Sequence, residues 1–274
     1  MPYLINKRID LTRTSRCRLS IQAHLNGFSF AILDEAEATT LCRQLHGHTF
    51  PDSHNPDDIY SETIMWCQKY SQLKYHYAST QCVFCTPTFT LVPESLFDPD
   101  RAAAILQSVH NINDLDEIYF HPLPQLEAIC VYAIPNSITA PILKHQPTTR
   151  FYSIAVPLIQ MLMPLYGHTR ILFYVHNDYL YLTLAKEQQL LLCNAYHTPE
   201  FTTALYFLSL VLHQWQLNPD STSLYISGQI PKHHRKMLHN YFPFITALSH
   251  NSIALPTLEH TLEYGTILHT VCAS

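Results

Sequence analysis

Apolar and polar side chains alternate over short stretches near the start of the chain, which is the pattern of half-buried β-strands. Strands are predicted over residues 19–25 and 28–33, joined by a hairpin turn, with a third strand over residues 39–45. Pro56 and the two aspartates after it open a predicted helix. Proline suits the first helical turn, and carboxylates suit the positive end of the helix dipole.

The middle of the chain is predicted to be rich in strands, with one helix over residues 98–110. The predicted strands cover residues 82–85, 88–92, 117–121 and 126–134. Pro135, Pro141 and Pro147 then indicate a broken connector. Residues 148–166 are predicted to be helical, with a kink or break at Pro157.

The opening pattern returns in the second half. The alternation predicts three strands, a long helix, a buried strand, a shorter helix and a last strand. In order, these cover residues 171–176, 179–184, 188–194, 199–217, 223–228, 231–241 and 244–248. Residues 258–271 form a further helix or strand, and the pattern does not decide between the two.

The two halves match when the chain is shifted by 151 positions. Asn26-Gly27-Phe28 then falls on Asn177-Asp178-Tyr179, and Phe30 falls on Tyr181. Leu41-Cys42 falls on Leu192-Cys193 in the same shift. An internal duplication explains the match, although any two meanders share part of this pattern. The duplication predicts two domains, residues 1–148 and residues 149–274.

A β-β-β-α-β-α lobe that occurs twice is the plan of the actin-like ATPase fold, a duplicated ribonuclease H-like α/β fold found in actin, sugar kinases and heat-shock chaperones. The whole chain also resembles an uncharacterised bacterial family of unknown function assigned to this fold. The likeness is carried by residues 19–33, by Phe89-Thr90-Leu91-Val92-Pro93 with Leu96-Phe97 after it, and by the hairpin of residues 171–184. The resemblance implies two lobes with a cleft between them.

The resemblance also implies where a nucleotide would bind. In actin-like ATPases, hairpin turns with glycines and an aspartate approach the phosphates, and a later turn with paired glycines holds the adenosine. The matching residues here are Asn26 and Gly27, Asn177 and Asp178, and Ser227 and Gly228. All three turns depart from the family pattern, because glycines are missing and Asp178 is the only carboxylate. We expect ordinary hairpin turns with at most weak nucleotide binding.

Composition narrows the function further. Charged residues make up 14% of the chain and aromatic residues 12%, which excludes a disordered protein. The net charge of −5 argues against nucleic-acid binding, and five glycines argue against a glycine-rich phosphate loop. No signal peptide or membrane-spanning run is predicted, and eight scattered cysteines suit a cytoplasmic protein with reduced thiols.

Three other groups of residues could carry chemistry. Cys82 and Cys85 lack a second cysteine pair and are predicted to pack in the core. Cys42, His46, His48 and His54 match no zinc spacing that we can name, and Lys232-His233-His234-Arg235-Lys236 is either a solvated helix face or a patch for an acidic partner.

No catalytic residue, metal site or cofactor is predicted from these groups. The first functional hypothesis is a non-catalytic interaction or scaffold protein, with a protein partner still to be identified, on a degenerate actin-like frame. The alternatives are a divergent nucleotide-binding protein with weak or no ATPase activity, and a metal-binding module that uses Cys42 and the nearby histidines.

Overall fold

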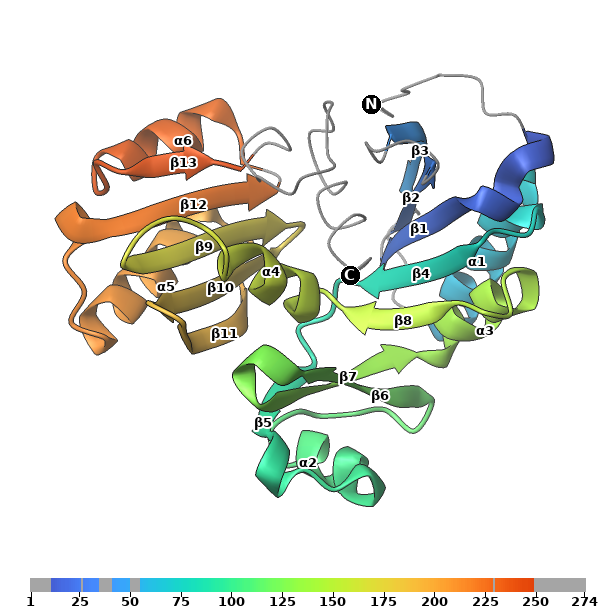
Figure 1. Cartoon of the computed structure of the whole chain (residues 1–274), viewed down its shortest axis with the longest axis horizontal. Helices are drawn as coiled ribbons and strands as arrows, with labels where there is room; N and C mark the ends of the chain where they lie inside the picture. The colour runs from blue at the N-terminus through green and yellow to red at the C-terminus, as the bar shows by residue number, and fades with distance from the viewer. Residues whose placement is uncertain (1–10, 26, 35–40, 50–54, 229, 249–274) are drawn as a thin grey trace. The chain divides into compact units, whose positions relative to one another are not determined.

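The computed structural model describes residues 11–25, 27–34, 41–49, 55–228 and 230–248 (Figure 1). The chain divides into two compact units between Val156 and Pro157. The domain boundary between residues 148 and 149 stays a prediction. None of the helices in the described ranges is long and apolar enough to cross a membrane.

Five of the described strands of the first unit form its larger sheet, with the order β3-β2-β1-β4-β8. β1, β2 and β3 are an antiparallel meander, whereas β4 pairs parallel with β1 and β8 pairs parallel with β4. The strands are β1 (Cys17–His24), β2 (Gly27–Asp34), β3 (Leu41–Thr49), β4 (Ser79–Phe84) and β8 (Arg150–Ser153).

Helix α1 (Pro56–Lys69) forms where the sequence predicts it and covers one face of this sheet. The side chain of Asn55 caps the helix by accepting a hydrogen bond from the backbone N–H of Asp57, at 3.1 Å. Trp66 is fully buried, with its ring stacked on Phe28 at a centroid distance of 4.7 Å and meeting Phe30 edge-on at 5.7 Å. These ring contacts pack α1 against β2.

A smaller antiparallel sheet is inserted between β4 and β8, with the order β5-β7-β6. Its strands are β5 (Phe89–Pro93), β6 (Asp116–Leu123) and β7 (Ala128–Pro135). Helix α2 (Ala102–Gln107) packs Leu106 against Ile129 and Val131 of β7. Short 3-10 turns join the elements of this unit at Leu11–Arg16, Ser71–Lys74, Glu94–Leu96, Pro99–Arg101 and Pro124–Leu126.

Two predictions around the prolines are wrong. The expected broken connector is helix α3 (Asn136–His145), with Pro141 inside it. Pro141 removes one backbone hydrogen bond, but α3 packs along α1 and buries Ile138 and Ile142, and local sequence does not reveal that contact.

Residues 150–153 form strand β8 instead of the start of a helix, because Phe151 pairs with Cys82 of β4. Helix α4 (Ala155–Leu162) follows it. Pro157 lies in the first turn of α4, where a missing N–H removes no helical hydrogen bond, so the helix is not broken there.

The second unit repeats the arrangement of the larger sheet, with the order β11-β10-β9-β12-β13 and the same antiparallel and parallel pairings. Helix α5 buries Ala204, Leu208 and Val211 against this sheet. The elements are β9 (Thr169–His176), β10 (Tyr179–Lys186), β11 (Gln189–His197), α5 (Phe201–Gln214), a 3-10 turn (Pro219–Ser221), β12 (Thr222–Gly228), α6 (Lys232–His239) and β13 (Ile245–Ala247). Residues 258–271 lie outside the described residues.

The match between the two hairpins differs from the predicted shift by one residue. His24 pairs with Gly27, and His176 pairs with Tyr179, so the hairpins superpose at a shift of 152 positions. Phe30 therefore corresponds to Leu182 rather than to Tyr181. Because side chains alternate between the faces of a strand, this single residue decides which side chains face the helix.

The two tryptophans give a matched test of this packing. Trp66 is 1% exposed and Trp215 is 36% exposed. We expect Trp66→Ala to lower the free energy of unfolding by about 3–5 kcal/mol, because it leaves a cavity beneath Phe28 and Phe30. Trp215→Ala should cost about 1 kcal/mol or less. Urea unfolding followed by circular dichroism measures both, and equal losses would contradict the assigned core.

Candidate functional site

The structure brings four of the predicted site residues to one end of the second sheet. Asn177 and Asp178 form the exposed turn between β9 and β10, and Ser227 and Gly228 end β12. Gly228 pairs with Val175 of β9, so the turn and the end of β12 lie next to each other. In the first unit, Gly27 is the buried first residue of β2, and Asn26 lies outside the described residues.

Hairpin geometry explains the residue types at the second turn. Asn177 has a φ of 49°, in the left-handed region that asparagine tolerates better than most residues. The backbone carbonyl of Asp178 accepts a hydrogen bond from the backbone N–H of Thr198, at 2.6 Å. Asparagine and aspartate are thus the residues that a tight turn selects, with no ligand needed.

Close packing of two strands explains Gly228. Its φ is 87°, which favours glycine, and a Cβ atom built on it would lie 2.1 Å from the carbonyl oxygen of Val175. Any side chain here would collide with the backbone of β9. Gly228 therefore serves the contact between β12 and β9, in the place where the resemblance implies an adenosine-binding turn.

The side chains around these turns supply little charge for a phosphate. The sequence has no Lys or Arg at residues 24–27, 176–179 or 226–228. Burial lowers the pKa of His24 to about 4, so its ring is neutral at pH 7. Aromatic rings pack beside the second turn instead, with Tyr179 5.3 Å from the ring of His197.

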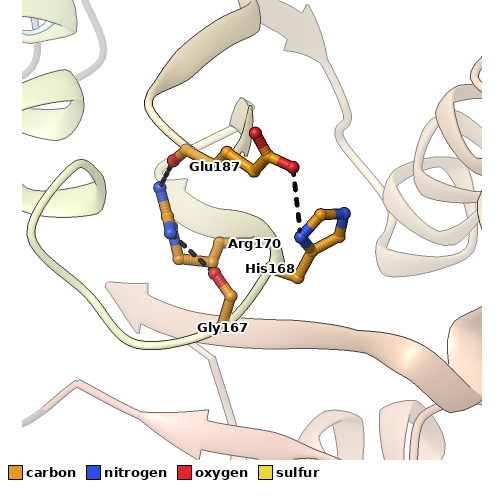
Figure 2. A network of polar contacts seen from close by, with 4 residues as sticks. All are labelled: Gly167, His168, Arg170 and Glu187. Carbon is orange, nitrogen blue, oxygen red and sulfur yellow. Dashed lines mark hydrogen bonds and ion pairs between the residues drawn. The ribbon is translucent and has the colours of Figure 1, made fainter.

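A buried arginine lies at the opposite end of β9 and holds two loops together (Figure 2). The guanidinium of Arg170 donates hydrogen bonds to the backbone carbonyls of Gly167, at 2.6 Å, and of Glu187. On the surface nearby, His168 Nδ1 lies 3.6 Å from a carboxylate oxygen of Glu187. Both acceptors of Arg170 are backbone atoms, so the network is a structural clamp.

The cysteine pair is placed for packing. Cys82 is buried in β4, and Cys85 is buried just beyond it, with the Gln22 amide donating to its Sγ atom at 3.2 Å. Burial raises the pKa of Cys85 to about 12, which keeps the thiol protonated and unreactive. Over the described residues, no group of three or more His, Cys, Asp or Glu side chains is placed to hold a metal ion. The side chains of Cys42, His46, His48 and His54 lie outside the described part.

One surface was not predicted from the sequence. A groove of about 680 Å³ runs along α5 and is bordered by the residues that follow α6. A signal for it is present in the sequence, because residues 201–214 contain no Asp, Glu, Lys or Arg. An amphipathic surface helix normally has a charged face.

Comparison with known proteins identifies the family. A family model described as "Protein of unknown function (DUF3822)" matches residues 6–245. The chain belongs to this family. No curated protein matches it.

Solved structures confirm the actin-like ATPase fold of this DUF3822 chain. It is similar to a protein of Bacteroides thetaiotaomicron with actin-like ATPase fold and unknown function, with a TM-score of 0.77 and 19% identity over 88% of this chain and 94% of that chain. It is also similar to a chain of a PilM–PilN type IV pilus biogenesis complex, with a TM-score of 0.54 and 11% identity over 85% and 88% of the two chains.

The role assigned to Gly228 can be tested by substitution. We expect Gly228→Ala to destabilise the second unit by about 2 kcal/mol or more, because the new methyl group meets the Val175 carbonyl and φ is positive. The neighbouring change Ser227→Ala should cost about 0.5 kcal/mol. Thermal unfolding of both variants gives the comparison, and an unshifted midpoint for Gly228→Ala would refute the packing role.

The clamp around Arg170 gives a second test. Arg170→Met removes the charged donor of two partly buried hydrogen bonds to backbone carbonyls, so we expect a loss of about 2 kcal/mol. Arg150→Met, at an exposed position of β8, is the control and should be nearly neutral. A midpoint for Arg170→Met that matches the control would show that the clamp does not stabilise the fold.

Proposed function

We propose that this protein is a non-catalytic interaction or scaffold protein built on the actin-like frame. The observation that carries the proposal is that Asn177 and Gly228 both have a structural reason to be there. Asn177 adopts the left-handed backbone of the hairpin, and Gly228 makes room for Val175. Phosphate binding is therefore not needed to explain why either residue occurs at its position.

The chemistry of phosphoryl transfer supports the same reading. Transfer needs backbone N–H groups or cations around the phosphates, and a carboxylate that organises Mg²⁺ and the attacking water. The turns contain no Lys or Arg and a single carboxylate, Asp178, which is exposed at the tip of a hairpin. An exposed, solvated carboxylate gains little of the field that a closed site provides.

The surface of the chain supports binding to a protein. Large apolar side chains are exposed in both units, among them Leu96 and Phe120 in the first unit and Tyr206 and Tyr241 in the second. Tyrosine and other aromatic residues are enriched where proteins bind each other. The PilM–PilN complex offers a precedent, since there a chain of this fold is found together with another protein.

A cytoplasmic location stays a prediction. The described cysteines are free thiols, and all but Cys193 are buried. Free, buried thiols are usual in proteins of reducing compartments.

The alternative function is weak nucleotide binding at the end of the second sheet, where the turn that contains Asp178 lies next to Gly228 at the end of β12. Isothermal titration of the full chain with ATP and with ADP, each with and without Mg²⁺, separates the two functions. We expect no binding heat up to about 1 mM nucleotide.

A matched pair of variants makes this titration decisive. Asp178→Asn changes the turn, and Asp220→Asn changes another exposed aspartate of the same unit. Micromolar binding that Asp178→Asn weakens and Asp220→Asn leaves intact would overturn the proposed function and establish a nucleotide site.

A further inference from the structure

Strand β11 forms one edge of the second sheet and lacks the features that usually protect an edge (Figure 1). It is nine residues long and contains no Asp, Glu, Lys, Arg or Pro. Its pairing with β10 shifts register once near the start of β11 and is regular from Leu192 to His197. A long, uncharged edge strand presents backbone groups to which another strand can add.

The other described edge strands are protected against such addition. β13 has three residues and β8 has four, so both are too short to pair extensively. Charged residues or prolines occur in the remaining edge strands and in β8. They are Arg43 in β3, Arg150 in β8, Pro93 in β5, and Asp116 and Pro122 in β6. Among the described edges, β11 is therefore the exception to a rule that this chain otherwise follows.

The outer backbone of β11 is available for pairing. Alternate residues of a strand direct their backbone N–H and C=O groups to opposite sides. The N–H of Ala195 donates to the side chain of Asn194, at 2.9 Å, and not to β10. Cys193 and His197 have the same parity as Ala195, so their backbone groups also point away from β10. No strand of the described ranges pairs with this side of β11.

Helix α5 adds an apolar surface beside this edge. The ring of Phe207 in α5 stacks on that of Tyr196 in β11, with centroids 4.3 Å apart. Leu210 lies on the same side of α5 as Phe207, three residues further along, and is 42% exposed. The edge therefore has two layers, a strand with outward backbone groups and a helix with an exposed leucine.

We propose that β11 pairs antiparallel with β11 of a second copy of this chain. A twofold axis perpendicular to the sheet relates the two strands in such a pair, so both α5 helices would lie on the same face of the joined sheet. Leu210 of one copy would then approach Leu210 of the other.

Two observations favour a second copy as the occupant. An added peptide strand covers the outer backbone of β11 but leaves Leu210 exposed, whereas a second copy covers both layers. Charge is also compatible with self-pairing. The chain has a net charge of −5, but residues 188–199 and 201–214 contain no Asp, Glu, Lys or Arg, so two copies meet here without repulsion between like charges.

Sedimentation velocity of the full chain measures the association. We expect a dimer at about 50 μM chain, with a dissociation constant in the micromolar range. The inference goes beyond the proposed function, because a dimer joined at β11 is compatible with or without nucleotide binding. Micromolar nucleotide binding would overturn the proposed function and leave the dimer standing.

Charged substitutions locate the interface. Asn194→Lys with His197→Lys places two cations at exposed positions of β11, and Leu210→Lys places one on the neighbouring side of α5. Each variant should raise the dissociation constant of the dimer by about tenfold or more.

The matched controls add the same charge elsewhere. Ser209→Lys changes another exposed side of α5, and Thr246→Lys changes the opposite edge of the same sheet, in β13. Each should change the dissociation constant less than twofold. Circular dichroism confirms that each variant is folded.

Cross-linking provides a measurement that does not depend on the lysine variants. A short bismaleimide should join two copies of Asn194→Cys, because antiparallel pairing brings these positions close together across the axis. The unsubstituted chain and Thr246→Cys should stay uncross-linked under the same conditions.

Four results would overturn the inference. The first is a monomer at about 50 μM chain. The second is a dimer that the control lysines weaken as much as the lysines of β11. The third is a dimer that tolerates Leu210→Lys, since pairing at β11 brings the two α5 helices together. The fourth is an Asn194→Cys dimer that does not cross-link.

Discussion

Parallel pairing between the first strand of a meander and a strand that returns beside it determines the architecture of both units. β4 returns beside β1, and β12 returns beside β9. A parallel return must cross the sheet, and a helix makes the crossing, α1 in the first unit and α5 in the second. The crossing places each helix over one sheet face, so the apolar residues of that face become a core.

The same pairing decides which residues the strand ends can hold. β12 ends beside the turn of the β9–β10 hairpin, and the two backbones approach so closely that Gly228 has no room for a side chain. The turn itself needs a left-handed residue, which Asn177 supplies. Backbone geometry alone therefore favours the residue types found at Asn177 and Gly228. Their presence in the sequence is weak evidence for nucleotide chemistry.

Local signals in the sequence predicted the individual helices and strands better than they predicted how the two halves of the chain match. Pro56 marked the start of α1 correctly, and the alternation predicted the strands of both hairpins. The predicted shift of 151 positions matches similar residue types in the two turns. The strand pairing instead requires a shift of 152 positions, which matches the residues that face the helices. Helix α3 was missed because its stability comes from packing against α1 despite Pro141. The contact of Gly228 with Val175 depends on the pairing of β12 with β9. These strands are far apart in the chain, so local sequence does not predict the contact.

Helices α1 and α5 make the same connection in their units but differ in their capping and charged residues. Helix α1 has a side-chain cap from Asn55, aspartates in its first turn and Lys69 in its last turn, all of which stabilise a helix in water. Helix α5 contains no Asp, Glu, Lys or Arg, and its N-cap residue Glu200 makes no side-chain cap hydrogen bond. Helix α6 has Lys232 in its first turn, where the helix dipole disfavours a cation. Since the same fold tolerates the stabilising pattern in α1, the architecture does not require the pattern of α5 and α6.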